Sequence, residues 1–181
     1  YFVTLTYSEV DLPLGESLEK RDLQDFLKRL RKNTGLKLRY FACGEYGDKK
    51  QRPHYHLLVF TDGEFNIVVD SDSSRKKDII ADSDFHQAWY TNSFVDVVPI
   101  IDDRSQAKVA AYVCGYVLKK LTSDRSLPGL KPEFTLMSRN PGIGGLFVKN
   151  LVKSLKQKNI GPIGVLADDV KFTANLQMVR I

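Results

Sequence analysis

The sequence is poor in cysteine, and this scarcity excludes a disulfide-stabilised scaffold. Its two cysteines, Cys43 and Cys114, are too few for a disulfide framework in 181 residues. Neither belongs to a CxxC pair of the kind that binds zinc. Because cytosolic proteins rarely contain disulfides, we expect a protein of the reducing cytoplasm.

Long apolar runs are absent as well. No run approaches the roughly 18 residues of a membrane-spanning helix, and no signal peptide is recognisable, so we expect no membrane partner. The chain starts at Tyr1 inside a strand-like segment and without methionine, which leads us to expect a fragment of a slightly longer protein. The length and the hydrophobic content of 43% predict one globular domain over residues 1–181.

Basic residues are more numerous than acidic ones, 27 against 22, which gives a net charge of +5. This balance suits a nucleic-acid partner without requiring one. Part of the basic charge falls on residues 17–32, where Leu23, Phe26, Leu27 and Leu30 form an apolar stripe at helical spacing. A basic helix is most often a solvated surface, but this one could also hold the phosphates of a nucleic acid.

The hydrophobic patterns predict alternating strands and helices. Strands are expected at residues 1–7, 37–46, 54–60 and 94–100, and helices at residues 17–32, 85–90, 104–121 and 145–158. Ser17 is the expected N-cap of the first helix and Gly35 its stop, while Asp82 or Ser83 caps the short helix. The segment 136–145 is expected to be a loop. The predicted fold is α+β, with a central, mostly antiparallel sheet and helices mainly on one face.

Two of the chain's three histidines, His54 and His56, lie one residue apart in a predicted strand. Because side chains alternate across a strand, both imidazoles share one face. If the strands 37–46 and 54–60 form a hairpin, Glu45 can reach the same point. Two imidazoles and a carboxylate leave coordination positions open, as a catalytic metal needs, and the set suits Mg²⁺ or Mn²⁺ but would also accept Zn²⁺ or Co²⁺. The plainer alternative is an exposed pair that binds nothing.

The predicted helix 104–121 presents Tyr112 and Tyr116 one turn apart, with Lys108 and Lys119 in the same sector. Tyrosines at this spacing often form a packing ladder. The nearby lysines favour chemistry, because a cation stabilises a phenolate or the charge that develops on a phosphoryl group. With a metal on the sheet face, a tyrosine oxygen could attack a phosphodiester.

In combination these motifs resemble the HUH endonucleases, and among them the rolling-circle replication initiators of the Microviridae, small phages with single-stranded DNA. The likeness is carried by HYH at residues 54–56 with Glu45 before it, by YVCGYVLK from Tyr112, by FVTLTY near the N-terminus and by FTLMSRNPGIG from Phe134. Those initiators tend to carry lysine at the end of both YxxK units, whereas the first unit here ends in glycine. Lys108 or Lys120 could serve in its place.

The resemblance implies a Rep-type, RRM-like sheet with a tyrosine-bearing helix at the active site. It implies that Glu45, His54 and His56 bind a divalent metal, Mg²⁺ or Mn²⁺. It also implies that the tyrosine pair and Lys119 are catalytic, in a single HUH endonuclease domain spanning residues 1–181.

The activity that the resemblance implies is site-specific nicking and rejoining of one DNA strand. The enzyme would cut a replication origin through a covalent 5′-phosphotyrosine, and so initiate and terminate rolling-circle replication. Its substrate would be single-stranded or stem-loop origin DNA, with host helicase and polymerase as further partners in the bacterial cytoplasm. We expect Lys108, Lys120 and Arg139 to contact the nucleic acid.

Two other functions compete with this hypothesis. A histidine-metal phosphoesterase would act on small nucleotides, but a hydrolase with a histidine triad would need a third alternating histidine where Leu58 stands. A nucleic-acid-binding module would use the face of the sheet without chemistry.

Overall fold

The computed structural model describes residues 1–48, 50–67, 83–90, 93–100, 107, 111, 115, 127–140 and 142–157. The chain divides into two compact units, Tyr1–Ser138 and Arg139–Ile181. In its described residues, the first unit holds a sheet with the helices α1 (Lys20–Thr34) and α2 (Asp84–Ala88), and the second holds α4 (Gly145–Gln157). A single endonuclease domain over residues 1–181 stays a prediction.

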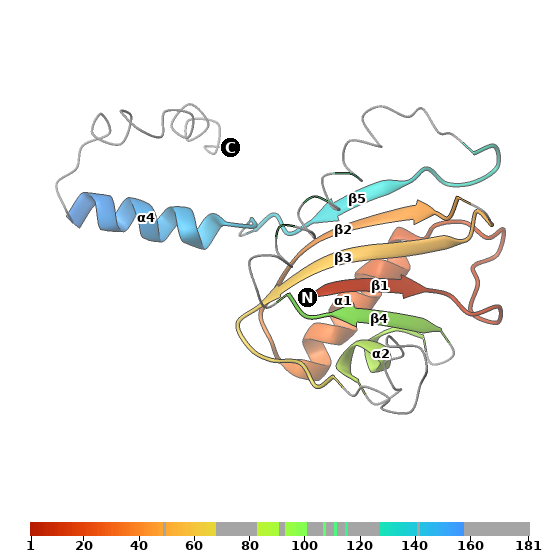
Figure 1. Ribbon diagram of the computed structural model, residues 1–181, viewed down its shortest axis with the longest axis horizontal. Coiled ribbons are helices and arrows are strands. Elements are labelled where there is room, and N and C mark those ends of the chain that lie inside the picture. The colour runs from red at the N-terminus through yellow and green to blue at the C-terminus, as the bar shows by residue number, and fades with distance from the viewer. Residues whose placement is uncertain are drawn as a thin grey trace. The chain divides into compact units, whose positions relative to one another are not determined.

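The sheet of the first unit has five strands in the order β4-β1-β3-β2-β5, and every neighbouring pair is antiparallel (Figure 1). The strands are β1 (Phe2–Thr6), β2 (Leu38–Tyr46), β3 (Pro53–Thr61), β4 (Phe94–Val98) and β5 (Phe134–Met137). The α+β class and the antiparallel sheet predicted from the sequence are therefore confirmed. The hairpin of β2 and β3 is confirmed as well.

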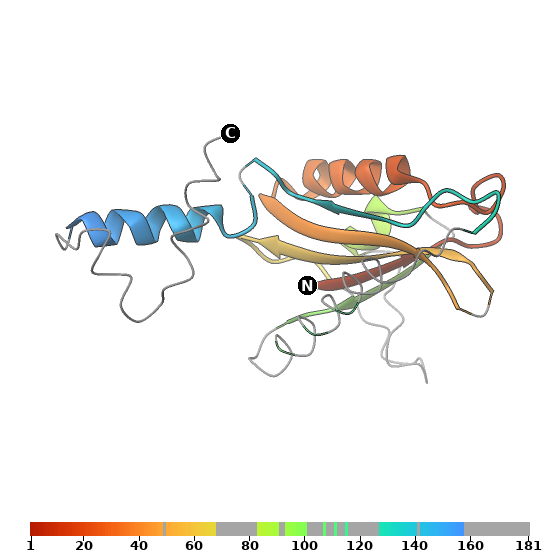
Figure 2. The same ribbon diagram turned by 90° about the horizontal axis from the view of Figure 1, so that it is seen from above.

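Both α1 and α2 lie on one face of this sheet (Figure 2). Alternation along β1 sends Val3 and Leu5 to the helix side, where they are fully buried. The opposite face carries Thr4 of β1 with His54 and His56 of β3, and we call it the histidine face. Among the described residues, no helix is long and apolar enough to span a membrane.

The core fills the space between the sheet and α1. The apolar stripe of α1, which the sequence predicted, is buried over its whole length at Leu23, Phe26, Leu27 and Leu30. Burial of a side chain of this size stabilises the fold by roughly 1.5–3 kcal/mol relative to exposure, before the entropic cost of ordering it. The stripe therefore fixes which face of the sheet α1 covers.

Helix α1 begins later than its sequence indicated, and the predicted cap at Ser17 is wrong. The N-cap is Glu19, whose side chain makes no capping hydrogen bond. The Ser17 hydroxyl instead lies 3.2 Å from the Tyr46 hydroxyl and accepts a hydrogen bond from the Lys131 amide at 2.8 Å. Ser17 therefore joins distant parts of the chain, which is a role that local sequence cannot reveal.

The other predicted helix ends agree with the structure. Gly35 ends α1 in the left-handed region with φ of +69°, and its N–H donates to the Arg31 carbonyl. At α2 the N-cap is Ser83, whose hydroxyl accepts from the His86 amide. Of the two candidate caps for this helix, Ser83 is confirmed.

Strand β5 corrects the prediction of a loop that begins at Leu136. It pairs with β2, so that Phe134 lies opposite Gly44. A Cβ atom on Gly44 would lie only 2.8 Å from Cε1 of the Phe134 ring, so this close approach requires glycine. Pairing between residues 90 positions apart, and not a strong local pattern, makes this short segment a strand.

A buried polar cluster joins the start of α1 to β3. The Tyr55 hydroxyl accepts a hydrogen bond from the Glu19 amide at 2.9 Å and lies 2.7 Å from the Tyr7 hydroxyl, which donates to Asp22. Burial raises the pKa of both phenols above the ordinary value, so they are neutral donors at any physiological pH. Tyr55 lies between the two histidines in the chain, so the cluster anchors their strand to the helix.

We expect Tyr55→Phe to lower the free energy of unfolding by roughly 1–3 kcal/mol, because it leaves buried hydrogen-bonding groups without a partner. Urea unfolding followed by circular dichroism measures the change. Tyr40→Phe is the matched control, since the Tyr40 hydroxyl has no hydrogen bond within the described part of the chain. Equal losses of unfolding free energy in both variants would show that the hydrogen bonds of the cluster do not stabilise the fold.

Candidate metal centre

Strand pairing brings the three predicted metal ligands together. In the hairpin, Glu45 lies directly opposite His54, and Cys43 lies opposite His56. The side chains at these positions point to the histidine face, because the residues between them face the helices. The predicted convergence of two imidazoles and one carboxylate is confirmed.

The three side chains are close enough to share one ion. The Oε1 atom of Glu45 lies 2.9 Å from Nε2 of His54 and 3.3 Å from Nε2 of His56. One ligand atom from each residue lies within 4.8 Å of the others, and no other group of this kind occurs in the described residues. Two imidazole nitrogens and one carboxylate oxygen fit a divalent cation and leave positions for water or substrate.

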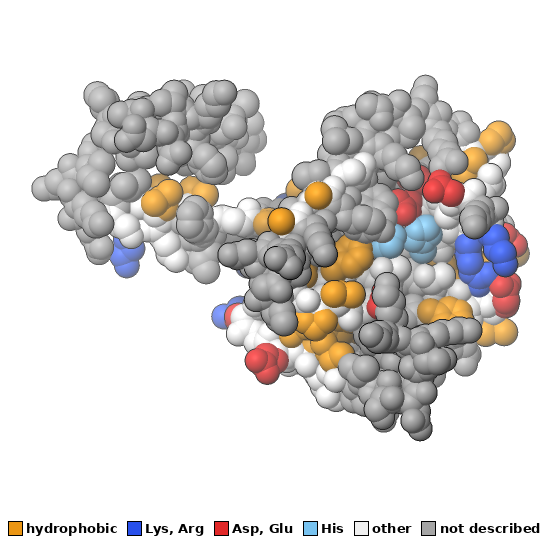
Figure 3. Space-filling view, viewed as in Figure 1, with side chains coloured by type: hydrophobic (Ala, Val, Ile, Leu, Met, Phe, Trp, Pro, Cys, Tyr) orange, Lys and Arg blue, Asp and Glu red, His pale blue; other side chains and the backbone are white. Residues whose placement is uncertain are grey.

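The histidine side chains gather over the middle of the histidine face, with acidic side chains beside them (Figure 3). The three side chains of the cluster are only 10–18% exposed. Partial burial strengthens electrostatic interactions while one side stays open to a ligand. The cluster is thus placed as an accessible site on the surface of the sheet.

A backbone carbonyl orients the ring of His54. Its Nδ1 atom lies 3.1 Å from the carbonyl oxygen of Arg52, which can only accept, so Nδ1 carries a proton and Nε2 faces Glu45. The guanidinium of Arg52 in turn donates to the carbonyl of Tyr7, with Nη2 at 2.7 Å. The end of β1 therefore positions the loop that orients His54.

Two side chains of β1 orient His56, and the sequence did not identify them. Nδ1 of His56 lies 3.1 Å from Oγ1 of Thr4, and the ring of Phe2 stacks on the imidazole with centroids 5.6 Å apart and an interplanar angle of 9°. Alternation along β1 places Thr4 on the same face of the sheet as the two histidines. Its contact with His56 requires the pairing of β1 with β3, which the sequence alone does not specify.

The carboxylate and the imidazole of the Glu45–His54 pair shift each other's pKa. Burial alone would raise the pKa of Glu45, but hydrogen bonds from His54 and His56 outweigh it and lower the pKa to about 2. Burial alone would lower the pKa of His54, but the hydrogen bond to Glu45 and that to the Arg52 carbonyl raise it. The metal-free pair therefore holds a proton that a metal ion has to displace.

The predicted catalytic helix lies largely outside the described residues. This applies to Tyr112, Tyr116 and Lys119, and also to Lys108 and Lys120. The positions described within it are helical and exposed, namely Ala107, Ala111 and Gly115. Those positions agree with the predicted helix, while the roles of the tyrosines and lysines stay predictions.

Arg139, predicted to contact nucleic acid, lies in the second unit. It is exposed and forms an isolated antiparallel bridge with Gly142. An exposed guanidinium is accessible to a phosphate, so the prediction stands untested.

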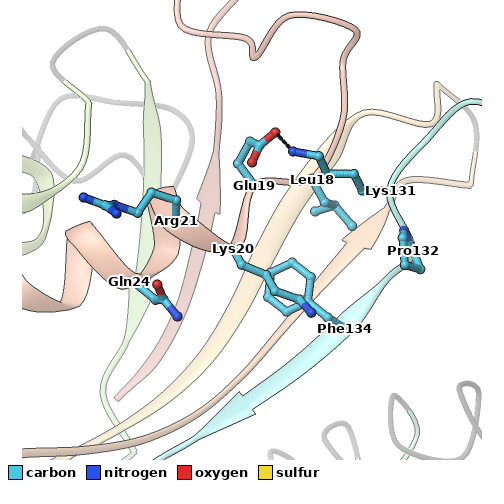
Figure 4. A pocket seen from close by; sticks show the side chains of 8 residues that line it. All are labelled: Leu18, Glu19, Lys20, Arg21, Gln24, Lys131, Pro132 and Phe134. Atoms are coloured by element: carbon cyan, nitrogen blue, oxygen red, sulfur yellow. Dashed lines mark hydrogen bonds and ion pairs between the residues drawn. The ribbon is translucent and has the colours of Figure 1, made fainter.

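The basic helix α1 lies behind the sheet and away from the metal cluster. Its cations engage the protein itself: Arg21 and Lys28 both pair with Asp25, and Arg29 donates to the carbonyl of Ala88. On this side of the sheet, the first turn of α1 and the segment before β5 line a hollow of about 410 Å³ (Figure 4). The sheet separates this hollow from the histidine face.

The cations that line this hollow also have partners. Nζ of Lys20 lies 5.2 Å from the centroid of the Phe134 ring, and Lys131 pairs with Glu19. These contacts fit the simpler interpretation of α1 as a solvated, packed helix. These cations therefore lie on the helix side of the sheet, away from the metal cluster.

An antiparallel sheet with a His-x-His strand and a carboxylate on the adjacent strand defines a Rep-type α+β protein with a candidate metal centre. The family model for Replication-associated protein ORF2 matches residues 1–121, which is well over half of the chain. The chain belongs to this family of replication-associated proteins.

Curated relatives of the chain come from phages and from a Spiroplasma virus. The chain is 32% identical over 132 residues to Replication-associated protein VP4 of Bdellovibrio phage phiMH2K, a match that covers 66% of this chain and 38% of that protein. It is 30% identical over 172 residues to Replication-associated protein ORF2 of Spiroplasma virus 4, covering 88% of this chain and 51% of that protein. The chain thus spans about half or less of these relatives. No solved structure matches it.

We expect the stabilisation of the protein by Mn²⁺ to grow as the pH rises from about 6 to about 8. Because the pKa of His54 is raised, the proton on Nε2 competes with the metal at the lower pH, and the competition ends as the pH passes that raised pKa. Thermal unfolding with and without Mn²⁺ measures the effect.

Without metal, the contribution of His54 to the stability of the protein falls as the pH rises. The raised pKa of His54 contributes stability that is complete below its ordinary pKa of 6.5 and is lost above the raised value, while the contribution of Glu45 is complete above its ordinary 4.5 and is lost towards pH 2. Glu45→Gln is the control, since it should remove the metal effect and the part of the raised pKa of His54 that the Glu45 carboxylate causes. A stabilisation by Mn²⁺ that persists in this variant would exclude the cluster as the metal site.

Proposed function

We propose that this chain is the endonuclease part of a replication initiator, which nicks one strand of an origin and rejoins it through a phosphotyrosine. The observation that carries the proposal is the convergence of Glu45, His54 and His56 on the histidine face. Membership of a replication-associated family supports it, and so does the order of the sequence motifs. In the proposed role the chain initiates and terminates rolling-circle replication.

In this proposal Glu45, His54 and His56 would hold Mg²⁺ or Mn²⁺. Bound there, the ion would polarise the scissile phosphate and offset its negative charge. The carbonyl of Arg52 and the hydroxyl of Thr4 keep the Nδ1 sides of the two rings occupied, so both Nε2 atoms face the ligand position. The protein therefore presents its ligand atoms before the substrate arrives.

The proposed nucleophile is the hydroxyl of Tyr112 or Tyr116. Its oxygen attacks phosphorus and loses its proton, the bond from phosphorus to the 3′ oxygen breaks, and that oxygen takes up a proton and leaves as a 3′-hydroxyl. Lys119 would stabilise the phenolate. The phosphotyrosine retains the energy of the phosphodiester, so a 3′-hydroxyl can reverse the reaction and rejoin the strand without ATP.

The substrate we propose is single-stranded DNA or the exposed loop of an origin stem-loop, because a phosphate in a stacked duplex is hard to bring to a sheet surface. Lys108, Lys120 and Arg139 would contact phosphates beside the cleaved one. In a bacterial cytoplasm, host helicase and polymerase would act on the nicked origin. A second tyrosine would let the protein cut the regenerated origin while the first linkage is resealed.

We expect the protein to form a covalent adduct with a single-stranded or stem-loop origin oligonucleotide in the presence of Mn²⁺. The adduct would appear as a retarded band on a denaturing gel, and mass spectrometry of the modified peptide would identify the tyrosine. The double variant Tyr112→Phe, Tyr116→Phe should abolish the band. An adduct that survives in this variant would disprove the assignment of the nucleophile.

We expect His54→Ala to reduce cleavage by roughly 100-fold or more while leaving most DNA binding intact, because loss of an outer partner alone costs about 10–100-fold at metal sites. Gel-shift and cleavage assays on the same oligonucleotide measure both. His86→Ala is the matched control, since this third histidine lies in α2 on the opposite side of the sheet.

Two results would favour the competing functions. Equal loss of binding and cleavage in His54→Ala would indicate a module that only binds or folds around this strand. Cleavage of mononucleotide esters without any adduct would indicate a histidine-metal phosphoesterase.

A further inference from the structure

A second carboxylate lies at the edge of the metal centre. The pairing of β2 with β5 runs from Phe41 opposite Met137 to Gly44 opposite Phe134. Continued by one residue, the same antiparallel register places Glu133 opposite Glu45. Because Phe134 is buried on the helix side, alternation directs Glu133 to the histidine face.

A backbone hydrogen bond fixes the side chain of Glu133. Its Oε1 atom accepts from the amide of Tyr46 at 3.0 Å, and Tyr46 directly follows Glu45 in β2. Within the described residues, no hydrogen bond to Oε2 is present. One carboxylate oxygen is therefore held in place while the other is available to water.

Glu133 lies beside the cluster in space. Residues directly opposite each other on antiparallel strands have Cβ atoms roughly 4.5–5.5 Å apart, so the continued register brings the carboxylate of Glu133 next to that of Glu45. The set of ligand atoms within 4.8 Å of one another does not contain Glu133. The carboxylate is thus close enough to act through its field but is not one of the direct ligands.

Two carboxylates at opposite positions of neighbouring strands repel each other unless positive charge lies between or beside them. A divalent ion held by two neutral imidazoles has two positive charges. Glu45 neutralises one of these charges, and Glu133 can neutralise the other. When His54 is neutral, the two carboxylates of the metal-free protein repel each other, and this repulsion turns into a favourable interaction when the ion binds.

We propose that Glu133 is a second carboxylate of the metal centre, which favours a hard divalent cation through its charge and through a water that its Oε2 atom binds. The inference rests on the proposed metal dependence of the cluster and assigns a residue beyond its three ligands. Glu133 is a positioning residue, because it acts on the ion without touching it directly.

The test is Mn²⁺ binding by calorimetry, without DNA, to the whole chain and to its Glu133→Gln variant. The amide oxygen of glutamine still accepts from the Tyr46 amide, so the variant removes the charge and keeps the structural bond. We expect about a tenfold weaker affinity for Mn²⁺, at the lower end of what loss of an outer partner costs. At a pH high enough to leave His54 neutral, the unfolding midpoint of the metal-free variant should be unchanged or higher.

Two further variants separate charge from structure. Glu133→Ala loses the bond to Tyr46 too, so it should weaken Mn²⁺ binding similarly and also lower metal-free stability. Glu64→Gln removes an exposed carboxylate after β3 and should leave Mn²⁺ affinity unchanged. The Glu64 variant therefore controls for the general loss of one negative charge.

Normal Mn²⁺ affinity in Glu133→Gln would overturn the inference, and so would a loss equal to that in Glu64→Gln. Failure of the unaltered protein to bind Mn²⁺ would overturn it as well. A protein that binds Mn²⁺ with the expected dependence on Glu133 but forms no DNA adduct would leave this inference standing and contradict the nicking proposal alone.

Discussion

The register of β3 against its two neighbours is the constraint on which the candidate site depends. A slip of one residue against β2 would send His54 and His56 into the apolar core and bring Tyr55 to the surface. The turn fixes this register: the Gly47 amide donates to the Arg52 carbonyl at 3.1 Å, and a residue in the left-handed region, Gln51 at φ +51°, completes it. The positions of the three candidate metal ligands therefore depend on the geometry of this hairpin.

The core supports the same register from below. Tyr55 lies between His54 and His56 in the sequence, and its side chain is fully buried on the opposite face of the sheet. Its hydroxyl accepts a hydrogen bond from the Glu19 amide at the start of α1. A strand shifted by one residue would lose this hydrogen bond and expose the side chain of Tyr55 to water. The same contacts therefore stabilise the fold and hold the metal ligands in place, and they lie on the helix side of the sheet, opposite the ligands.

Much of this arrangement follows from local sequence patterns. Alternation in β3 predicted that the two imidazoles share a face, and the short polar segment after Tyr46 is typical of the hairpin loop that brings Glu45 to His54. Contacts between distant segments could not be predicted in this way. Thr4 required the pairing of β1 with β3, while Ser17 and Glu133 required the short strand β5, whose partner lies some 90 residues earlier.

The distribution of charge indicates how a phosphodiester would be handled. Acidic side chains lie beside the histidines on the histidine face, while several cations of α1 lie on the other face and pair with Asp25 or with backbone carbonyls (Figure 3). Carboxylates at the cluster repel a phosphate until a divalent ion reverses the local charge. In the proposed function the ion therefore determines where the strand is cut, and affinity along the strand has to come from cations outside the cluster. Binding of the DNA strand and its cleavage are then separable in the proposed function, because cations outside the cluster provide the first and the metal ion provides the second.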